Sequence, residues 1–263
     1  MFYMLTGAHT AIHTDEFGKM LDDWQLTSKV HVVVRDNVDD MARGTEVAGI
    51  PSVGCFAHSM QLCIQPQLTS KKDDMKHIVQ LLAQCRSLGD HFSHSVLAKE
   101  KFRRVQESMQ GIPHHQLTQD VATRWNSTYY MVDRIVEQEE AITSYERHYR
   151  GELPVAVPSS FKFGWLRQLV HLLRPVEEAT REICRHSATA ADVIPVIMAV
   201  KLKLQTDDGE DMRPVRDNIL SQIGECLALL FIFTALHGMQ SRYSDGNSVC
   251  LSVCLSVRQM RAL

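Results

Sequence analysis

A short run of β-branched residues, Val30-His31-Val32-Val33-Val34, restricts the folds open to this chain. Continuous β-branched runs are typical of strands that are covered on both faces, as in a parallel sheet. A helix is expected before this run, with Thr14 as its N-cap and apolar residues at helical spacing up to Trp24. Residues 2–6 are predicted to form another short strand. Together these segments predict a strand–helix–strand unit of an α/β fold.

Helical spacing of apolar residues dominates the rest of the sequence, which is therefore predicted to be predominantly helical. The expected helical segments are residues 38–46, 72–110 and 125–149, with three more helices after 160. Cys55 to Ile64 is interpreted either as a short strand turning into a helix or as a helix alone. Leu117 to Val121 is predicted as a further strand, and Pro175 as a kink or the first turn of a new helix. The Pro- and Ser-containing residues 151–160 predict a subdomain boundary.

Composition excludes several classes of protein. The chain has 263 residues, 44% of them hydrophobic, which is enough for a folded core. Because the net charge is −3, any contact with nucleic acid must come from a local patch. The seven cysteines include no Cys-x-x-Cys pair and suit reduced thiols, not a secreted disulfide framework. The longest apolar run, Cys226 to Leu236, is too short to span a bilayer, so we expect no membrane association.

Asp36 follows the β-branched run, at a position where α/β folds place active groups. In nucleases and transposases of the ribonuclease H type, such a carboxylate helps to hold divalent metals. Mg²⁺ requires several hard oxygen ligands, so one Asp does not make a site. The alternative is that Asp36 or Asn37 caps the next helix.

Cys55 and His58 lie three residues apart and can share one helix face. Two ligands do not make a tetrahedral zinc site, so no resident metal is expected here. The histidine could instead touch a substrate or hold a loop.

Two segments are candidates for contact with nucleic acid. Arg124 beside Trp125 could contact a phosphate and stack on an exposed base. The alternative places Trp125 in the core and Arg124 in a salt bridge. The second segment is a basic run, which could meet a nucleic-acid backbone or could be the solvated face of a helix. The run consists of Lys99, Lys101, Arg103 and Arg104.

The end of the sequence has a different character. Residues 248–257 repeat the tetrapeptide Cys-Leu-Ser-Val. A tandem TGTC tetranucleotide encodes these four amino acids in this order, so residues 246–263 are interpreted as a low-complexity, microsatellite-like tail. The alternative is an ordinary alternating strand.

Three ordered motifs give the sequence a resemblance to a known family. They are Lys29 to Asn37, Cys55 to Leu62 and Gln119 to Met131. In this order they resemble the hAT transposases, and in particular the branch of domesticated zinc finger BED domain-containing proteins. Glu177 to Glu182 and Ala188 to Pro195 are also similar to that branch. The resemblance covers about Met4 to Leu204.

The resemblance implies a ribonuclease H-like catalytic core interrupted by an all-α insertion. The expected fold class is therefore α/β, an incomplete ribonuclease H-like core followed by an all-α insertion domain, predominantly helical overall. On this basis residues 1–150 are expected to be a partial core and residues 151–245 a portion of the insertion domain.

The resemblance also implies roles for single residues. Members of the family bind Mg²⁺ with a triad of two Asp and one Glu, and Asp36 stands at the position of the second Asp. Cys55 and His58 match the family's Cys-x-x-His motif. Arg124 and Trp125 match its Arg-Trp motif, which lies close to the DNA end being cut.

Departures from the family pattern decide the expected function. The first Asp of the triad is expected upstream of this sequence and the Glu beyond the repeat, so one carboxylate of three remains. The zinc finger and the dimerisation segment are also expected to be absent. The sequence therefore predicts a truncated, catalytically inactive nuclear protein without a cofactor. Its expected partners are DNA, bound weakly, or chromatin and transcription proteins.

Two alternatives stay open. One is a domesticated binding module in transcription regulation, with Arg124, Trp125 and the basic run as its contact surface. The other is a metal-dependent strand-transfer enzyme, if the true chain is longer or if Asp120 or Glu178 replaces a missing acid.

Overall fold

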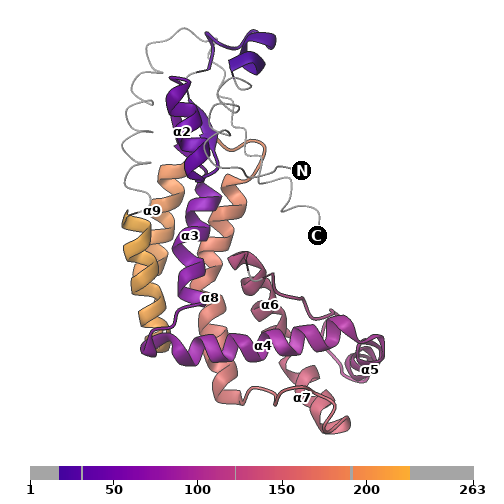
Figure 1. Cartoon of the computed structure of the whole chain (residues 1–263). Helices are drawn as coiled ribbons and strands as arrows, with labels where there is room; N and C mark the ends of the chain where they lie inside the picture. Colours follow the sequence, from indigo (N-terminus) through magenta and orange to yellow (C-terminus); the bar gives the residue numbers. More distant parts are fainter. Residues whose placement is uncertain (1–17, 31, 122, 190–191, 226–263) are drawn as a thin grey trace. The chain divides into compact units, whose positions relative to one another are not determined.

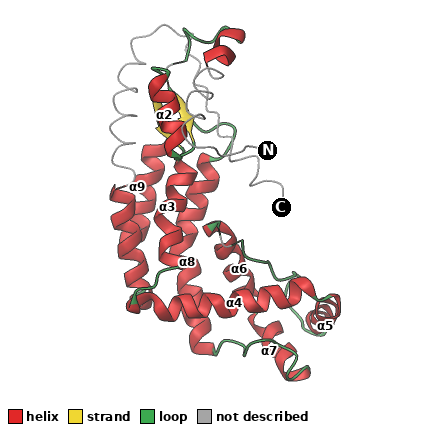
Figure 2. Cartoon of the chain, in the orientation of Figure 1, coloured by secondary structure: helices red, strands yellow, loops and turns green. Residues whose placement is uncertain are grey.

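The computed structural model describes residues 18–30, 32–121, 123–189 and 192–225 and is predominantly helical (Figure 2). The predicted strand at residues 2–6, the helix start at Thr14 and the repeat tail lie outside the described residues. The chain divides into two compact units. The first consists of the described parts of Met1–Met60, Ala179–Ala199 and Ile223–Leu263, and the second of Gln61–Glu178 and Val200–Gln222.

The first unit contains a parallel β–α–β crossover, whose helix α2 is labelled in Figure 1. Its elements are β1 (Val33–Arg35), α2 (Asp39–Val47) and β2 (Ser52–Gly54). In the ladder Val33 pairs with Ser52, Val34 with Val53 and Arg35 with Gly54. The helix predicted at residues 38–46 is confirmed as α2. The observed crossover joins the β-branched segment to the strand after it.

The β-branched run forms a shorter strand than its composition suggests. β1 begins at Val33 and ends at Arg35. Backbone hydrogen bonds extend the pairing slightly, from Val33 N to Pro51 O at 2.9 Å and from Cys55 N to Arg35 O at 2.7 Å. The strand is thus as long as its three-residue partner β2 allows.

Helices make up most of the remaining described chain (Figure 1). The elements are α3 (Phe56–Leu68), η1 (Asp73–Met75), α4 (Lys76–His94), α5 (Val96–Glu107), α6 (Trp125–Glu137), α7 (Glu139–His148), α8 (Ser160–Ile183), α9 (Val193–Gln205) and η3 (Glu210–Met212). Residues 213–225 are also helical. Pro175 lies inside α8 and does not end it. Each helix in the described ranges is too short or too polar to cross a membrane.

Two side chains divide helices that the periodicity predicts to be continuous. Ser95 separates α4 from α5, and its Oγ caps α5 by accepting a hydrogen bond from Ala98 N at 3.1 Å. Gln138 separates α6 from α7. Its buried amide accepts from Gln106 Nε2 and donates to Pro113 O, both at 2.7 Å. Apolar spacing runs through both breaks and therefore does not reveal them.

The strand predicted at Leu117–Val121 is wrong, because this segment is part of an irregular connection. Side chains, not a neighbouring strand, bind the backbone just before it. Gln106 Nε2 donates to His115 O at 2.8 Å, and Arg134 Nη1 donates to Gln116 O at 3.2 Å. A short apolar run can form a strand only where another strand is available to pair with it.

Aromatic rings lie at the centre of the second unit. The Phe92 ring centroid on α4 is 4.8 Å from that of Phe102 on α5 and 5.0 Å from that of Tyr145 on α7. All three side chains are buried. These contacts fix α4, α5 and α7 around one core.

Phe163 and Phe161 of α8 form a matched pair, because Phe163 is 1% exposed and Phe161 is 68% exposed. We expect Phe163→Ala to lower the free energy of unfolding by about 3–5 kcal/mol, through lost burial and a cavity. Phe161→Ala is expected to cost less than about 1 kcal/mol. Urea unfolding followed by circular dichroism measures both, and equal losses would contradict this packing.

Candidate functional site

Parallel pairing brings polar residues together at one edge of the two-stranded sheet. Asp36 and Asn37 follow β1, and Cys55 follows β2. Because α3 begins directly afterwards, His58 and Ser59 lie in its first turn. We call these five residues the strand-end cluster. All of them belong to the first unit.

An acid–base pair lies at the solvent side of the strand-end cluster. His58 Nδ1 is 2.7 Å from Asp36 Oδ1, and the two side chains are 30% and 40% exposed. The same carboxylate oxygen accepts a hydrogen bond from Asn37 N at 2.7 Å. Asp36 Oδ1 is therefore already held by two groups of this chain.

A chain of hydrogen bonds fixes the inner side of the cluster. Asn37 Nδ2 donates to Ser59 Oγ at 2.9 Å, and Ser59 Oγ donates to Cys55 O at 3.1 Å. The Asn37 amide also lies against Gly54, where an added Cβ would be 2.2 Å from Asn37 Oδ1. A side chain at position 54 would therefore force the Asn37 amide to move.

Arg35 joins the two strands from within the ladder. Its Nε donates to Ser52 Oγ at 3.0 Å, and its Nη1 donates to Asp36 O at 3.0 Å. Burial lowers the pKa of Arg35, while the charges of Asp36 and Asp39 oppose that shift. Arg35 thus supports the backbone at the position of Asp36.

Asp120 is the centre of a second polar cluster, which lies in the second unit. Its side chain is 3% exposed, and Oδ2 accepts a hydrogen bond from Arg86 Nε at 2.6 Å. Oδ1 accepts from Ser127 Oγ at 2.6 Å and from Thr128 Oγ1 at 3.0 Å. We call these four residues the Asp120 cluster. It ties α4 to the start of α6.

The expectation that the Trp125 indole stacks on an exposed base is wrong for this structure. Trp125 is 0% exposed, and its backbone N–H donates to Gln61 Oε1 at 3.0 Å. The part of the alternative that places Trp125 in the core therefore holds. Arg124 occupies the N-cap position of α6 and is half-buried.

Acidic neighbours balance the charge of the three cations predicted to contact DNA on α5. Lys101 Nζ is 2.5 Å from Glu152 Oε1 and 4.7 Å from the centroid of the Tyr149 ring. Arg103 pairs with Glu100 and Glu107, and Arg104 pairs with Glu100. The solvated-face interpretation of the basic run therefore describes Lys101, Arg103 and Arg104.

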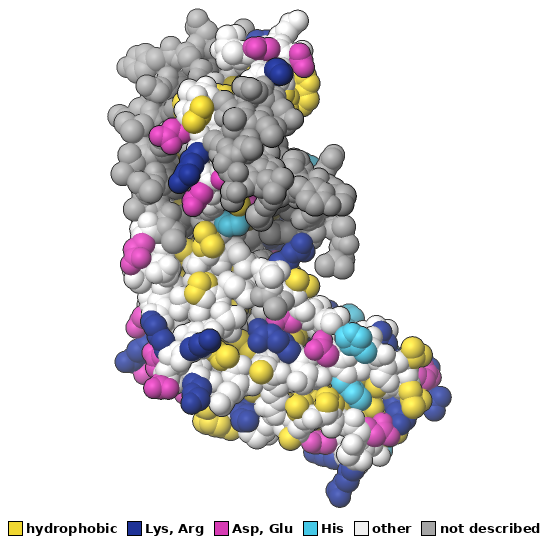
Figure 3. All heavy atoms as spheres, viewed as in Figure 1, with side chains coloured by type: hydrophobic (Ala, Val, Ile, Leu, Met, Phe, Trp, Pro, Cys, Tyr) yellow, Lys and Arg dark blue, Asp and Glu magenta, His cyan; other side chains and the backbone are white. Residues whose placement is uncertain are grey.

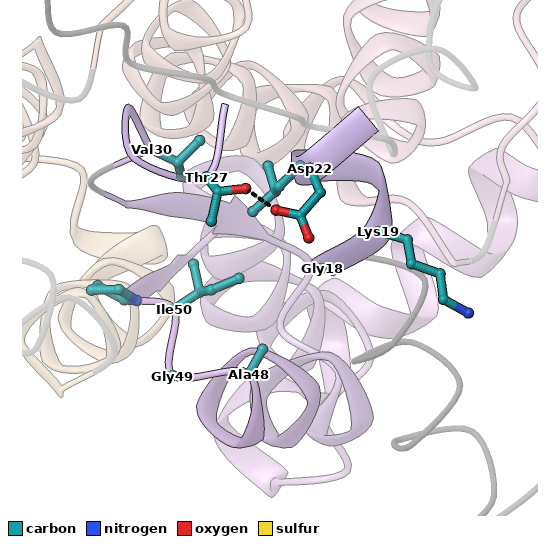
Figure 4. A pocket seen from close by; sticks show the side chains of 10 residues that line it. Gly18, Lys19, Asp22, Thr27, Val30, Ala48, Gly49 and Ile50 are labelled. Carbon is teal, nitrogen blue, oxygen red and sulfur yellow. Dashed lines mark hydrogen bonds between the residues drawn. The ribbon is translucent and has the colours of Figure 1, made fainter. Parts of the chain in front are cut away.

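A cavity of about 580 Å³ lies in the first unit and is lined by residues that precede the two strands in sequence. Its walls come from residues 18–30 and 48–51. Figure 4 shows Asp22 and Thr27, joined by a hydrogen bond, on one side and Ile50 on the other. No residue predicted as a functional site lines it.

Comparison with known proteins finds similarity to zinc finger BED domain-containing proteins. The model of the ZBED1 RNase-like helical domain matches residues 53–160. Human Zinc finger BED domain-containing protein 4 is 27% identical over 179 residues, which is 67% of this chain and 14% of that protein. Human Zinc finger BED domain-containing protein 6 is 29% identical over 173 residues, which is 66% of this chain and 17% of that protein. The mouse protein 6 is 28% identical over 191 residues, 73% of this chain and 18% of that protein.

Over about two thirds of its length, this chain is similar to zinc finger BED domain-containing proteins. It spans 14–18% of the length of the curated relatives that it matches. The match to the helical domain begins inside β2 and ends at the first residue of α8. It contains the whole Asp120 cluster and the basic run, whereas Asp36 lies before it.

The Mg²⁺ site of hAT transposases does not fit the described residues of this relative. Mg²⁺ prefers a near-octahedral set of oxygen ligands. Asp36 provides the carboxylate of the strand-end cluster, and its Oδ1 already contacts His58 and the Asn37 N–H. Across the described ranges, no group of three or more His, Cys, Asp or Glu side chains could hold a metal ion.

The sequence does not predict which residues of the two polar clusters contact one another. Arg86 is 34 residues away from Asp120, and nothing in the local pattern connects them. The Ser127 and Thr128 hydroxyls lie close in sequence to Asp120, so a local polar cluster was readable there. The contact of Gly54 with Asn37 depends on strand pairing, which a single sequence does not specify.

Gly54→Ala is expected to destabilise the chain by about 1–3 kcal/mol, because the new methyl group would overlap the Asn37 amide. Gly164→Ala is the matched control, since no atom lies within 4 Å of its added Cβ inside α8. It is expected to stabilise the helix by up to about 1 kcal/mol. Thermal unfolding of both variants measures the difference, and a neutral Gly54→Ala would refute the close approach.

Asp120→Asn is expected to lower the free energy of unfolding by about 3–5 kcal/mol, because it leaves the Arg86 charge without its partner. Asp217→Asn removes the same charge from a pair whose carboxylate is 58% exposed, and should cost less than about 1 kcal/mol. Denaturant titration separates the two predictions. Similar costs would mean that Asp120 contributes no more than a surface acid.

Proposed function

We propose that this chain is a catalytically inactive, hAT transposase-derived nuclear protein that acts as an interaction module. In this proposal residues 1–150 are a partial ribonuclease H-like core, and residues 151–245 are a portion of an all-α insertion domain. Its partners are chromatin or transcription proteins, and contact with DNA is weak. The relation to the zinc finger BED domain-containing proteins supports this assignment.

The observation that carries the proposal is the engagement of the acids that strand transfer would need. Asp36 Oδ1 contacts His58 and the Asn37 N–H. Asp120 is 3% exposed and bonded to Arg86, and Glu178 pairs with Lys203 at 3.3 Å. Two-metal strand transfer needs several carboxylates that converge on the ions. Each of these three acids instead pairs with a group of this chain.

The local charge balance supports a protein partner over DNA. Lys101, Arg103 and Arg104 each pair with a carboxylate. A phosphate backbone would have to compete with these acids, and it would be repelled by them. The helix α5, which carries these cations, also has apolar surface that a protein partner can bind.

Plasmid nicking with Mg²⁺ or Mn²⁺ tests the catalytic part of the proposal. We expect the full chain and its Asp36→Ala variant to give the same background, and Asp39→Ala of α2 serves as a matched control. Metal-dependent nicking that Asp36→Ala alone abolishes would overturn the proposal.

Fluorescence anisotropy with a duplex oligonucleotide across a salt series tests the binding part. Weak binding is expected, with little change on Arg103→Gln, because that guanidinium is already paired. Tight binding with a steep loss of affinity in salt would instead establish a phosphate-binding surface.

A further inference from the structure

A groove runs along α5 in the second unit, beside the connection to α6. It encloses a cavity of about 290 Å³. Phe92, Phe102 and Leu117 form an apolar floor and are themselves buried, at 2%, 3% and 7% exposure. The rim residues on α5 include Lys99 and Arg103. We call this feature the α5 groove.

Two exposed apolar residues lie at the start of α5, and one of them lines the α5 groove. Val96, which also lines the cavity, is 82% exposed, and its neighbour Leu97 is 64% exposed. Figure 3 shows hydrophobic and charged side chains gathered over the α5 end of the chain. Apolar surface rimmed by polar groups is typical of sites that bind another protein.

The size of the cavity argues for part of a larger partner. Pockets for small molecules and cofactors are about 300–1,000 Å³. The α5 groove, at about 290 Å³, lies at the lower limit of that range and continues into exposed apolar surface. It is suited to a few apolar side chains of a partner segment.

The charges around the groove indicate which partner fits. Glu100 and Glu107 line it, but both pair with Arg103, and Glu100 also pairs with Arg104. Hydrogen bonds from Arg103 and Arg104 lower the pKa of Glu100, which keeps that acid ionised and engaged. The backbone N–H of Lys99 donates to Ser95 O at 3.0 Å, but its ammonium group makes no ion pair or hydrogen bond within the described ranges. Lys99 is therefore the cation of the rim that pairs with no described acid.

We infer that the α5 groove binds an acidic amphipathic segment of a partner protein. An apolar side chain of that segment packs on Phe92, Phe102 and Leu117, and a neighbouring carboxylate pairs with Lys99. Nucleic acid is the less suitable occupant, because the rings of the floor are buried and offer no exposed face for a base. The inference rests on the proposed interaction function and names the chemistry of the partner.

The test uses the full chain and a fluorescein-labelled synthetic helical peptide that carries leucines on one face and glutamates beside them. We expect anisotropy to detect binding that Lys99→Glu weakens by about tenfold or more, through charge reversal. Lys99→Arg is expected to retain the affinity. Lys162→Glu, an exposed lysine of α8 outside the groove, is the matched control and should leave the affinity unchanged.

Two further experiments separate the apolar from the charged contribution to peptide binding. Val96→Ser, at a position 82% exposed, should weaken binding without unfolding the chain. Peptides with lysine for every glutamate, or serine for every leucine, should bind at least tenfold more weakly than the parent peptide.

The inference fails if the parent peptide does not bind, or if Lys99→Glu and Lys162→Glu have equal effects. It also fails if a single-stranded oligonucleotide displaces the peptide through Lys99. These outcomes are independent of the nicking assay. If the chain nicks DNA with a metal ion and still binds the peptide, only the proposed lack of catalysis is wrong. If the chain neither nicks DNA nor binds the peptide, only the inferred binding of an acidic segment to the α5 groove is wrong.

Discussion

The second unit depends on one buried carboxylate. Asp120 receives hydrogen bonds from Arg86 on α4 and from Ser127 and Thr128 at the start of α6. Removing a charge from water costs several kcal/mol, so such a group is tolerated only where partners occupy its oxygens. The same segment places Trp125 in the core. The motif that resembles a DNA contact of the family therefore connects α4 to α6 in this chain.

Local physics made much of the helical fold predictable. The apolar spacing of α2 and α6 is a property of neighbouring residues, and α2 was predicted within one residue at each end. Trp125, Tyr129 and Val132 are buried at helical spacing, which favoured the core interpretation of the tryptophan. The breaks at Ser95 and Gln138 were not predictable, because capping and a buried amide network interrupt an otherwise continuous pattern.

The candidate sites were harder to predict, because they depend on pairs that are distant in sequence. Lys101 and Glu152 are 51 residues apart in sequence. A count of cations along α5 therefore predicts a basic surface, whereas in the structure an acid from another segment neutralises Lys101. Asp36 and His58 were recognised separately through motifs, but their 2.7 Å contact follows from the parallel pairing of β1 with β2. Among the cations of the basic run, Lys99 differs from its neighbours for the same reason: no described acid reaches it.

The close approach of Gly54 to Asn37 couples two positions that belong to different strand ends. A larger residue at 54 becomes tolerable only if the side chain at 37 shrinks or turns away, so the effects of changes at the two sites are not additive. Substitution of Asn37 also removes the hydrogen bond to Ser59, which has its own cost. The residue that is tolerated at one of these two positions therefore depends on the residue at the other, which links the sequence at the end of β1 to that at the end of β2 even where no chemistry is being selected.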